Sequence, residues 1–115
     1  MAREWFIEKT DYGAYTCPIH KSIMLIGDKW TLFILREFIY GAEKQSFNSL
    51  LRSLKPISSR TLSLKLKKMQ KIGLVTKKVI RKERPMKVEY QITQMGKSLK
   101  NALQSIANWH KKYAP

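Results

Sequence analysis

The chain has 115 residues, and 23 lysines and arginines against 8 aspartates and glutamates give it a formal net charge of +15. This length suits one domain, and 43% hydrophobic with 27% charged residues are typical of a folded protein, not of a disordered basic tail. The charge favours an anionic partner, nucleic acid or an acidic membrane surface, whereas no apolar run approaches the ~20 residues that a membrane-spanning helix needs.

The N-terminal third of the chain predicts two helices behind an arm. Residues 1–16 mix aromatic and charged side chains without a clean period, and we interpret them as an N-terminal arm. Isoleucines at helical spacing predict a first helix over 18–26, which begins on a proline. Asp28 is suited to cap a second helix over 29–40. That helix is apolar nearly all round, so we expect it at the centre of the core.

The middle of the chain predicts two further helices separated by a turn. A short helix is expected near 48–54, followed by a turn around Pro56. The next helix, over 59–72, has the best-defined ends, because Ser58 can cap it and Gly73 can stop it.

After Gly73 the pattern changes to β structure. Residues 74–80 are rich in β-branched side chains, residues 88–92 alternate, and the charged turn 81–85 lies between them, which predicts a hairpin. Thr93 is then expected to cap one last helix that runs to about residue 113. This order of elements predicts a mainly helical α+β fold of the winged helix-turn-helix type, in which one helix enters the major groove of DNA and the hairpin flanks it.

Positive charge is concentrated in the same region. Residues 58–90 hold eleven cations and two acids, a net charge of +9 in 33 residues, while the other 82 residues carry +6. If the charge were the only observation, a solvated basic face would be enough to explain it. Its coincidence with the predicted groove helix and hairpin favours double-stranded DNA as the partner.

The predicted groove helix can be divided into faces. A buried stripe is expected from Leu62, Leu66 and Met69, and the N-terminal half of the opposite side would face the bases. We predict base readout by Ser59, Arg60, Ser63 and Leu64. An arginine can grip guanine with two hydrogen bonds and an outward leucine can meet a thymine methyl, although packing under the hairpin would explain Leu64 equally well.

Other cations of this region are expected to touch the DNA backbone. Phosphate contacts, which position a protein without specifying sequence, are predicted for Lys65, Lys67, Lys68 and Lys71. In the wing we expect contacts from Arg81, Lys82, Arg84 and Lys87, beside a proline that stiffens the turn.

Several motifs follow one another in register along the chain. They are Cys17-Pro18-Ile19, the stretch 26–37, Phe47-Asn48-Ser49-Leu50, the segment 57–62, Leu66, Gly73-Leu74-Val75, and 88–93 followed by Gly96. Together they resemble the HxlR-type family of winged-helix transcription regulators, which is related to the MarR family. The sequence departs from that family at Asp28, where a second glycine is usual, and in a slightly longer polar stretch at 42–46. The resemblance assigns residues 17–108 to an HxlR-type winged helix domain and 93–115 to a C-terminal dimerisation helix that is part of the same single domain.

The resemblance implies a homodimer on operator DNA, with the terminal helices forming the dimer interface. The last helix supports this with a wide apolar stripe, whose interface members we take to be Leu99, Leu103, Ile106, Trp109 and Tyr113. Packing on the domain's own core would explain Leu99 and Leu103. Trp109 and Tyr113 lie beyond the expected reach of that core, so a partner explains them better.

Cys17 is the candidate for a regulatory site. Several members of the family sense electrophiles or oxidants through a cysteine at this Cys-Pro position. A thiol just ahead of a helix N-terminus feels the positive end of the helix dipole, which favours the reactive thiolate. The alternative is a small buried core residue without reactivity.

The residue inventory offers no catalytic or metal site. Cys17 is the only cysteine, which excludes an internal disulfide framework and makes the cytoplasm the expected location. It cannot complete a zinc site with His20 and His110 at any usual spacing. No glycine-rich phosphate loop occurs. We therefore expect neither enzyme activity nor a cofactor.

These observations favour a sequence-specific DNA-binding transcriptional regulator that acts as a homodimer on a near-palindromic operator, with Cys17 as its thiol sensor. A non-specific winged helix, architectural or RNA-binding, is the alternative. A winged helix used for protein contact is a third reading, against which the charge of +9 argues.

Overall fold

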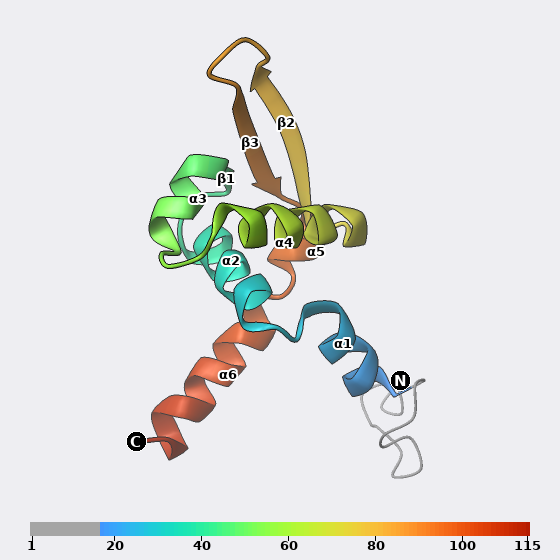
Figure 1. Cartoon of the computed structure of the whole chain (residues 1–115). Helices are drawn as coiled ribbons and strands as arrows, with labels where there is room; N and C mark the ends of the chain where they lie inside the picture. The colour runs from blue at the N-terminus through green and yellow to red at the C-terminus, as the bar shows by residue number, and fades with distance from the viewer. Residues whose placement is uncertain (1–16) are drawn as a thin grey trace.

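The computed structural model describes residues 17–115, and the arm expected at 1–16 lies outside that range. The described elements are α1 (Pro18–Ile26), α2 (Lys29–Tyr40), β1 (Lys44–Ser46), α3 (Phe47–Ser53), α4 (Ser59–Ile72), β2 (Val75–Arg81), β3 (Lys87–Ile92), α5 (Gln94–Lys97) and α6 (Lys100–Tyr113). The β2–β3 hairpin stands on one side of the helical body, and α1 and α6 leave it on the other (Figure 1). The mainly helical winged helix-turn-helix fold predicted from the sequence is confirmed.

Local hydrogen bonds fix the helix ends where the sequence predicts them. Asp28 accepts the Thr31 backbone amide at 2.9 Å, and Ser58 accepts the Thr61 amide at 3.0 Å. Gly73 ends α4 with φ of +100°, a left-handed conformation that glycine adopts without steric cost. The predicted bounds of α1, α2 and α4 are therefore confirmed.

The core lies between α2, α3, α4 and the base of the sheet. Its members are Ile34, Leu35, Phe38, Leu50, Leu54, Ile57, Leu62, Leu66, Met69, Leu74, Val75, Tyr90 and Ile92. Helix α2 contributes Ile34, Leu35 and Phe38 to this core, as expected for a helix at its centre, but its other side is not covered, since Phe33 is 37% exposed and Tyr40 is 50% exposed. The domain is too small to cover both faces of that helix.

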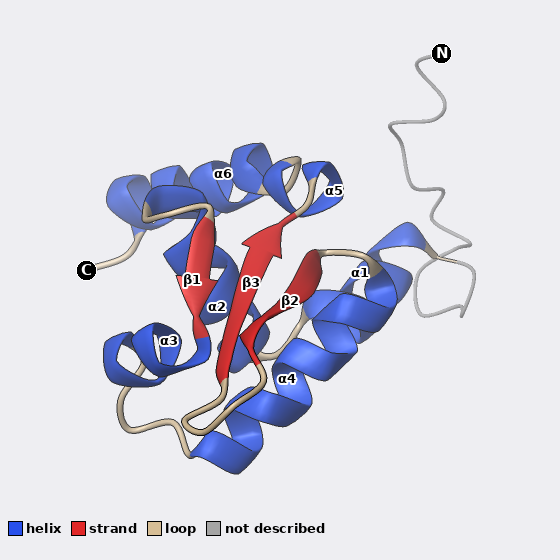
Figure 2. Ribbon diagram, turned by 90° about the horizontal axis from the view of Figure 1, so that it is seen from above, coloured by secondary structure: helices blue, strands red, loops and turns tan. Residues whose placement is uncertain are grey.

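The sheet has a third strand that the sequence pattern does not predict. β1 pairs antiparallel with β3, so the strand order is β1-β3-β2 (Figure 2). The polar stretch 42–46, expected to be a longer connection before the third helix, contains this edge strand instead. Its side chains show no apolar alternation because the strand contributes mainly backbone pairing. The helix that follows begins at Phe47 and ends at Ser53, one residue earlier at each end than expected.

The C-terminal segment forms two helices, so the prediction of one continuous helix is wrong. Thr93 caps only α5, accepting the Gly96 amide at 3.1 Å and donating its hydroxyl to Gly73 O at 2.6 Å. Gly96 is buried, and a Cβ there would lie 2.6 Å from Leu74 O. After this close contact the Leu99 amide bonds to Gly96 O, only three residues back, and α6 begins at Lys100.

Candidate nucleic-acid interface

Helix α4 buries one side and presents the other to solvent. Leu62, Leu66 and Met69 are fully buried, as the helical period predicts. The four predicted base readers, Ser59, Arg60, Ser63 and Leu64, are all exposed. Leu64 has 56% of its surface exposed, so packing under the hairpin does not explain it within residues 17–115.

The four lysines of α4 have two different environments. Lys67 and Lys71 are exposed, and neither takes part in an ion pair among the described residues. Lys65 instead points to the start of α2, where its ammonium lies 3.3 Å from the Asp28 carboxylate. Lys68 donates to Met24 O of α1 at 3.5 Å. Lys65 and Lys68 therefore connect the groove helix to the body of the protein, and their predicted phosphate contacts remain untested.

Asp28 is the centre of that connection. Its carboxylate accepts the Thr31 amide at 2.9 Å, the Thr31 hydroxyl at 2.7 Å and the Lys65 ammonium at 3.3 Å. Partial burial alone would raise the pKa of Asp28, but the Thr31 hydrogen bonds and Lys65 together outweigh it and lower the pKa below its ordinary value. The ionised form of Asp28 is therefore the one that fastens α4 to α2.

The wing is an exposed, cationic hairpin. Its four predicted contact residues, Arg81, Lys82, Arg84 and Lys87, are all exposed. Arg81 Nε donates to Pro85 O at 3.1 Å, which closes the tip of the hairpin. The strand register shifts between Val79 and Arg81, and such an irregularity increases the local twist of a hairpin.

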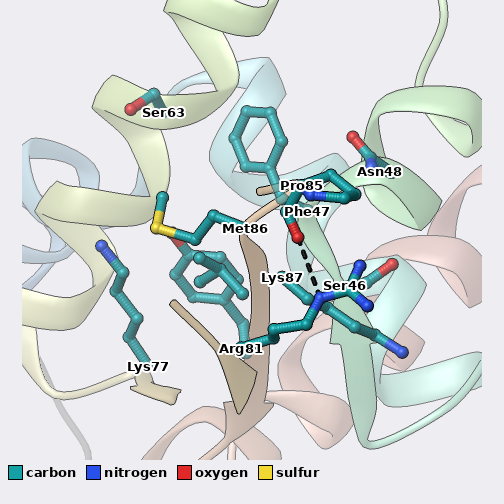
Figure 3. A pocket seen from close by; sticks show the side chains of 11 residues that line it. Ser46, Phe47, Asn48, Ser63, Lys77, Arg81, Pro85, Met86 and Lys87 are labelled. Atoms are coloured by element: carbon teal, nitrogen blue, oxygen red, sulfur yellow. Dashed lines mark hydrogen bonds between the residues drawn. The ribbon is translucent and has the colours of Figure 1, made fainter. Parts of the chain in front are cut away.

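Between the wing and the helices lies an open cleft of about 420 Å³ (Figure 3). The hairpin contributes Lys77, Arg81, Pro85, Met86, Lys87, Val88 and Tyr90, and the opposite wall contributes Ser46, Phe47, Asn48 and Ser63. Burial raises the pKa of Tyr90, so its hydroxyl remains a hydrogen-bond donor well above neutral pH. Sequence reasoning missed the wall formed by Ser46 and Asn48, because the strand that carries Ser46 was not predicted and Asn48, on the short helix that was predicted, was not assigned a contact. Alternation along the hairpin could have placed Lys77 and Tyr90 on one face.

A second exposed surface is apolar and lies on the terminal helices. Leu99 and Leu103 pack partly against the core, whereas Ile106, Trp109 and Tyr113 are 60%, 59% and 66% exposed. The rings of Trp109 and Tyr113 lie 6.4 Å apart. Helix α1 also has no buried residue, and its exposed apolar side chains are Ile19, Ile23, Met24 and Leu25.

Cys17 is buried, with 2% of its surface exposed, at the N-cap position of α1. Its thiol makes no capping hydrogen bond to the helix. The expected location ahead of the helix N-terminus is therefore present, but the thiol does not face solvent.

The described part of the chain contains neither a metal site nor a membrane-spanning helix. No group of three or more histidine, cysteine or acidic residues there could hold a metal ion. Nor does any helix among residues 17–115 have the length and apolar character needed to cross a bilayer.

Comparison with known proteins gives a consistent set of relatives. The model of the HxlR-like helix-turn-helix family matches residues 25–115. The HTH-type transcriptional regulator YdeP of Bacillus subtilis is 32% identical over 97 residues, which cover 84% of this chain and 73% of YdeP. The residues matched by the family model include α2, α4, the hairpin and α6.

Solved structures also resemble most of the chain. A MarR-family transcriptional regulator from Porphyromonas gingivalis W83 superposes with a TM-score of 0.77 at 29% identity, covering 88% of this chain and 96% of that one. The redox regulator HypR in its reduced form superposes with a TM-score of 0.72, also at 29% identity, covering 83% and 91% of the two chains.

Proposed function

This chain belongs to the HxlR-like helix-turn-helix family of transcriptional regulators, and we propose that it binds a specific, near-palindromic DNA operator as a homodimer. Membership of this family also confirms that the chain is not an enzyme. One observation carries the proposal. The exposed side of α4 and the cationic wing are neighbouring elements that enclose one cleft, so a single duplex can meet both.

Within this interface the residues have different roles. Base readout is assigned to Ser59, Arg60, Ser63 and Leu64, which are exposed in the N-terminal half of α4. Backbone contact is assigned first to Lys67, Lys71 and the wing cations, since none of them forms an ion pair with another described residue. Lys65 and Lys68 are weaker candidates because each already contacts another helix.

The homodimer is proposed from the apolar side of α6. Ile106, Trp109 and Tyr113 are each more than half exposed, which is unusual for large apolar side chains grouped on one helix. A second copy of the chain would cover this surface. The domain assigned to residues 17–108 would then dimerise through the helix assigned to residues 93–115. Two-fold symmetry then places the two groove helices on half-sites about 34–36 Å apart, one turn of the duplex.

A thiol response through Cys17 is the second part of the proposal. HypR, which has a similar fold, is a redox regulator, and Cys17 precedes a helix that carries no buried residue. Because the thiol is 2% exposed, an electrophile reaches it only when the start of α1 opens. With one cysteine per chain, the products are an alkyl adduct, a sulfenic acid, a mixed disulfide or a disulfide between subunits. The lone cysteine also fits a reducing, cytoplasmic location.

Selection of bound duplexes from a random-sequence pool tests the main proposal. We expect a near-palindromic site with half-sites one helical turn apart, bound roughly 10³-fold or more tightly than unrelated DNA at physiological salt. A non-specific architectural or RNA-binding protein would enrich no sequence and bind all duplexes, or RNA, about equally. That outcome would replace the proposal with this alternative.

A further inference from the structure

Any duplex that meets both α4 and the wing must pass a strand over the cleft between them. The major and minor grooves of B-DNA are separated by one sugar-phosphate backbone. If α4 occupies the major groove and the wing the neighbouring minor groove, that backbone lies between the two elements. The space between them is the cleft of about 420 Å³ lined by β1, β2, β3, α3 and α4 (Figure 3).

The chemistry of the cleft suits a phosphodiester. Three of its lining cations, Lys77, Arg81 and Lys87, take part in no ion pair within the part of the chain that the structure describes. The facing wall offers the neutral donors Ser46, Asn48 and Ser63, and neither acid of the basic segment 58–90 lines the cleft. Positive charge on one wall and hydroxyl or amide donors on the other match an anion that has two exposed oxygens.

We infer that this cleft is the seat of the backbone phosphates between the two grooves, with Lys77 as its principal cation and Asn48 as a donor on the facing wall. Neither residue was assigned a DNA contact from the sequence. This inference rests on the proposed function and deepens it. It also implies that Ser63, a predicted base reader, lies at the edge where helix and backbone meet.

The hairpin provides a matched control. Lys77 pairs across the sheet with Tyr90, which also lines the cleft, whereas Lys78 pairs with Glu89, which does not. Because side chains alternate between the two faces of a strand, these adjacent lysines point to opposite sides of the hairpin. Both are exposed and both carry one positive charge, so Lys77→Gln and Lys78→Gln remove the same charge from different faces.

The first measurement is the salt dependence of binding to a duplex that carries the selected site. The full-length Lys77→Gln variant should reduce the slope of log affinity against log salt concentration by about 1.8, because the dimer loses one phosphate contact in each half-site and each contact contributes about 0.9. Between 50 and 200 mM salt, the loss of affinity then becomes about 12-fold smaller than for the wild type. Lys78→Gln should leave the slope close to that of the wild type, and Asn48→Ala should weaken binding without changing the slope.

The second measurement locates the phosphate. Duplexes with one neutral methylphosphonate, placed in turn at each backbone position beside the half-site, should lose affinity for the wild type at one or two adjacent positions. For Lys77→Gln, a methylphosphonate at those positions should cause no further loss of affinity. For Lys78→Gln, it should cause the same loss of affinity as for the wild type. Equal behaviour of the two lysine variants in both measurements would overturn the inference and leave the proposed function standing. Failure of the wild type to bind any duplex would overturn both.

Discussion

Replacing Asp28 by alanine should lower the free energy of unfolding by about 2 kcal/mol. Loss of the N-cap bond to Thr31 accounts for ~1 kcal/mol. The Thr31 hydroxyl, which is fully buried and donates to the carboxylate at 2.7 Å, accounts for about 1 kcal/mol more when that partner is removed. The ion pair with Lys65 adds little, because 29% and 32% of the two side-chain surfaces remain exposed to solvent.

Asp28→Asn is the matched control for this prediction. Asparagine is an equally good helix cap, and its amide can still hydrogen-bond to Thr31, so only the charge facing Lys65 is lost. We expect this variant to lose less than about 0.5 kcal/mol. Urea unfolding followed by circular dichroism at one fixed protomer concentration measures both variants, since the stability of a dimer depends on concentration.

The pH dependence gives an independent test of the same reasoning. Because the folded protein lowers the pKa of Asp28 below its ordinary value of 3.8, the charge of Asp28 stabilises the fold above that pH. This contribution is lost as the pH falls through the lowered pKa of the folded state. The difference between wild type and Asp28→Asn should therefore disappear in acid. The reasoning would be refuted if Asp28→Ala were no less stable than Asp28→Asn. It would also be refuted if the difference in stability between the wild type and Asp28→Asn persisted unchanged in acid.

Three further predictions concern the interfaces. Arg60→Ala should weaken operator binding by ~1–3 kcal/mol and relax the sequence preference at one base pair, whereas Lys71→Ala should weaken binding to all duplexes about equally. If both variants lose affinity uniformly on every duplex, the assignment of the base-reading face is wrong. Ultracentrifugation should find a dimer for the wild type and a folded monomer or weak dimer when Ile106 and Trp109 are both replaced by serine, and a wild-type monomer with full operator affinity would contradict this. Diamide should change operator affinity in the wild type but not in Cys17→Ser; alkylation of the thiol should be slow, since the site must open first, and an unchanged affinity after complete modification would make Cys17 a core residue only.

The sequence by itself determined those features that depend on residues a few positions apart. Asp28 and Ser58 cap the starts of α2 and α4 through bonds to the amide three residues on, and Gly73 ends α4 through its own left-handed dihedral angle. The buried stripe of α4 follows from the helical period alone. Because such interactions are local, the exposed side of the groove helix and the position of the wing could be predicted from the order of the residues.

The tertiary structure decided whatever depends on distant segments. β1 exists because the backbone of Lys44–Ser46 finds the free edge of β3, and polar side chains carry no sign of that pairing. The last helix divides where Gly96 meets Leu74 O, a contact between segments that the chain brings together only on folding. Docking of α4 on α2 likewise occupies Lys65 while Lys71 remains exposed, although both are lysines of one basic helix. A pattern reports which residues are polar, but only packing decides which polar groups are left for a partner.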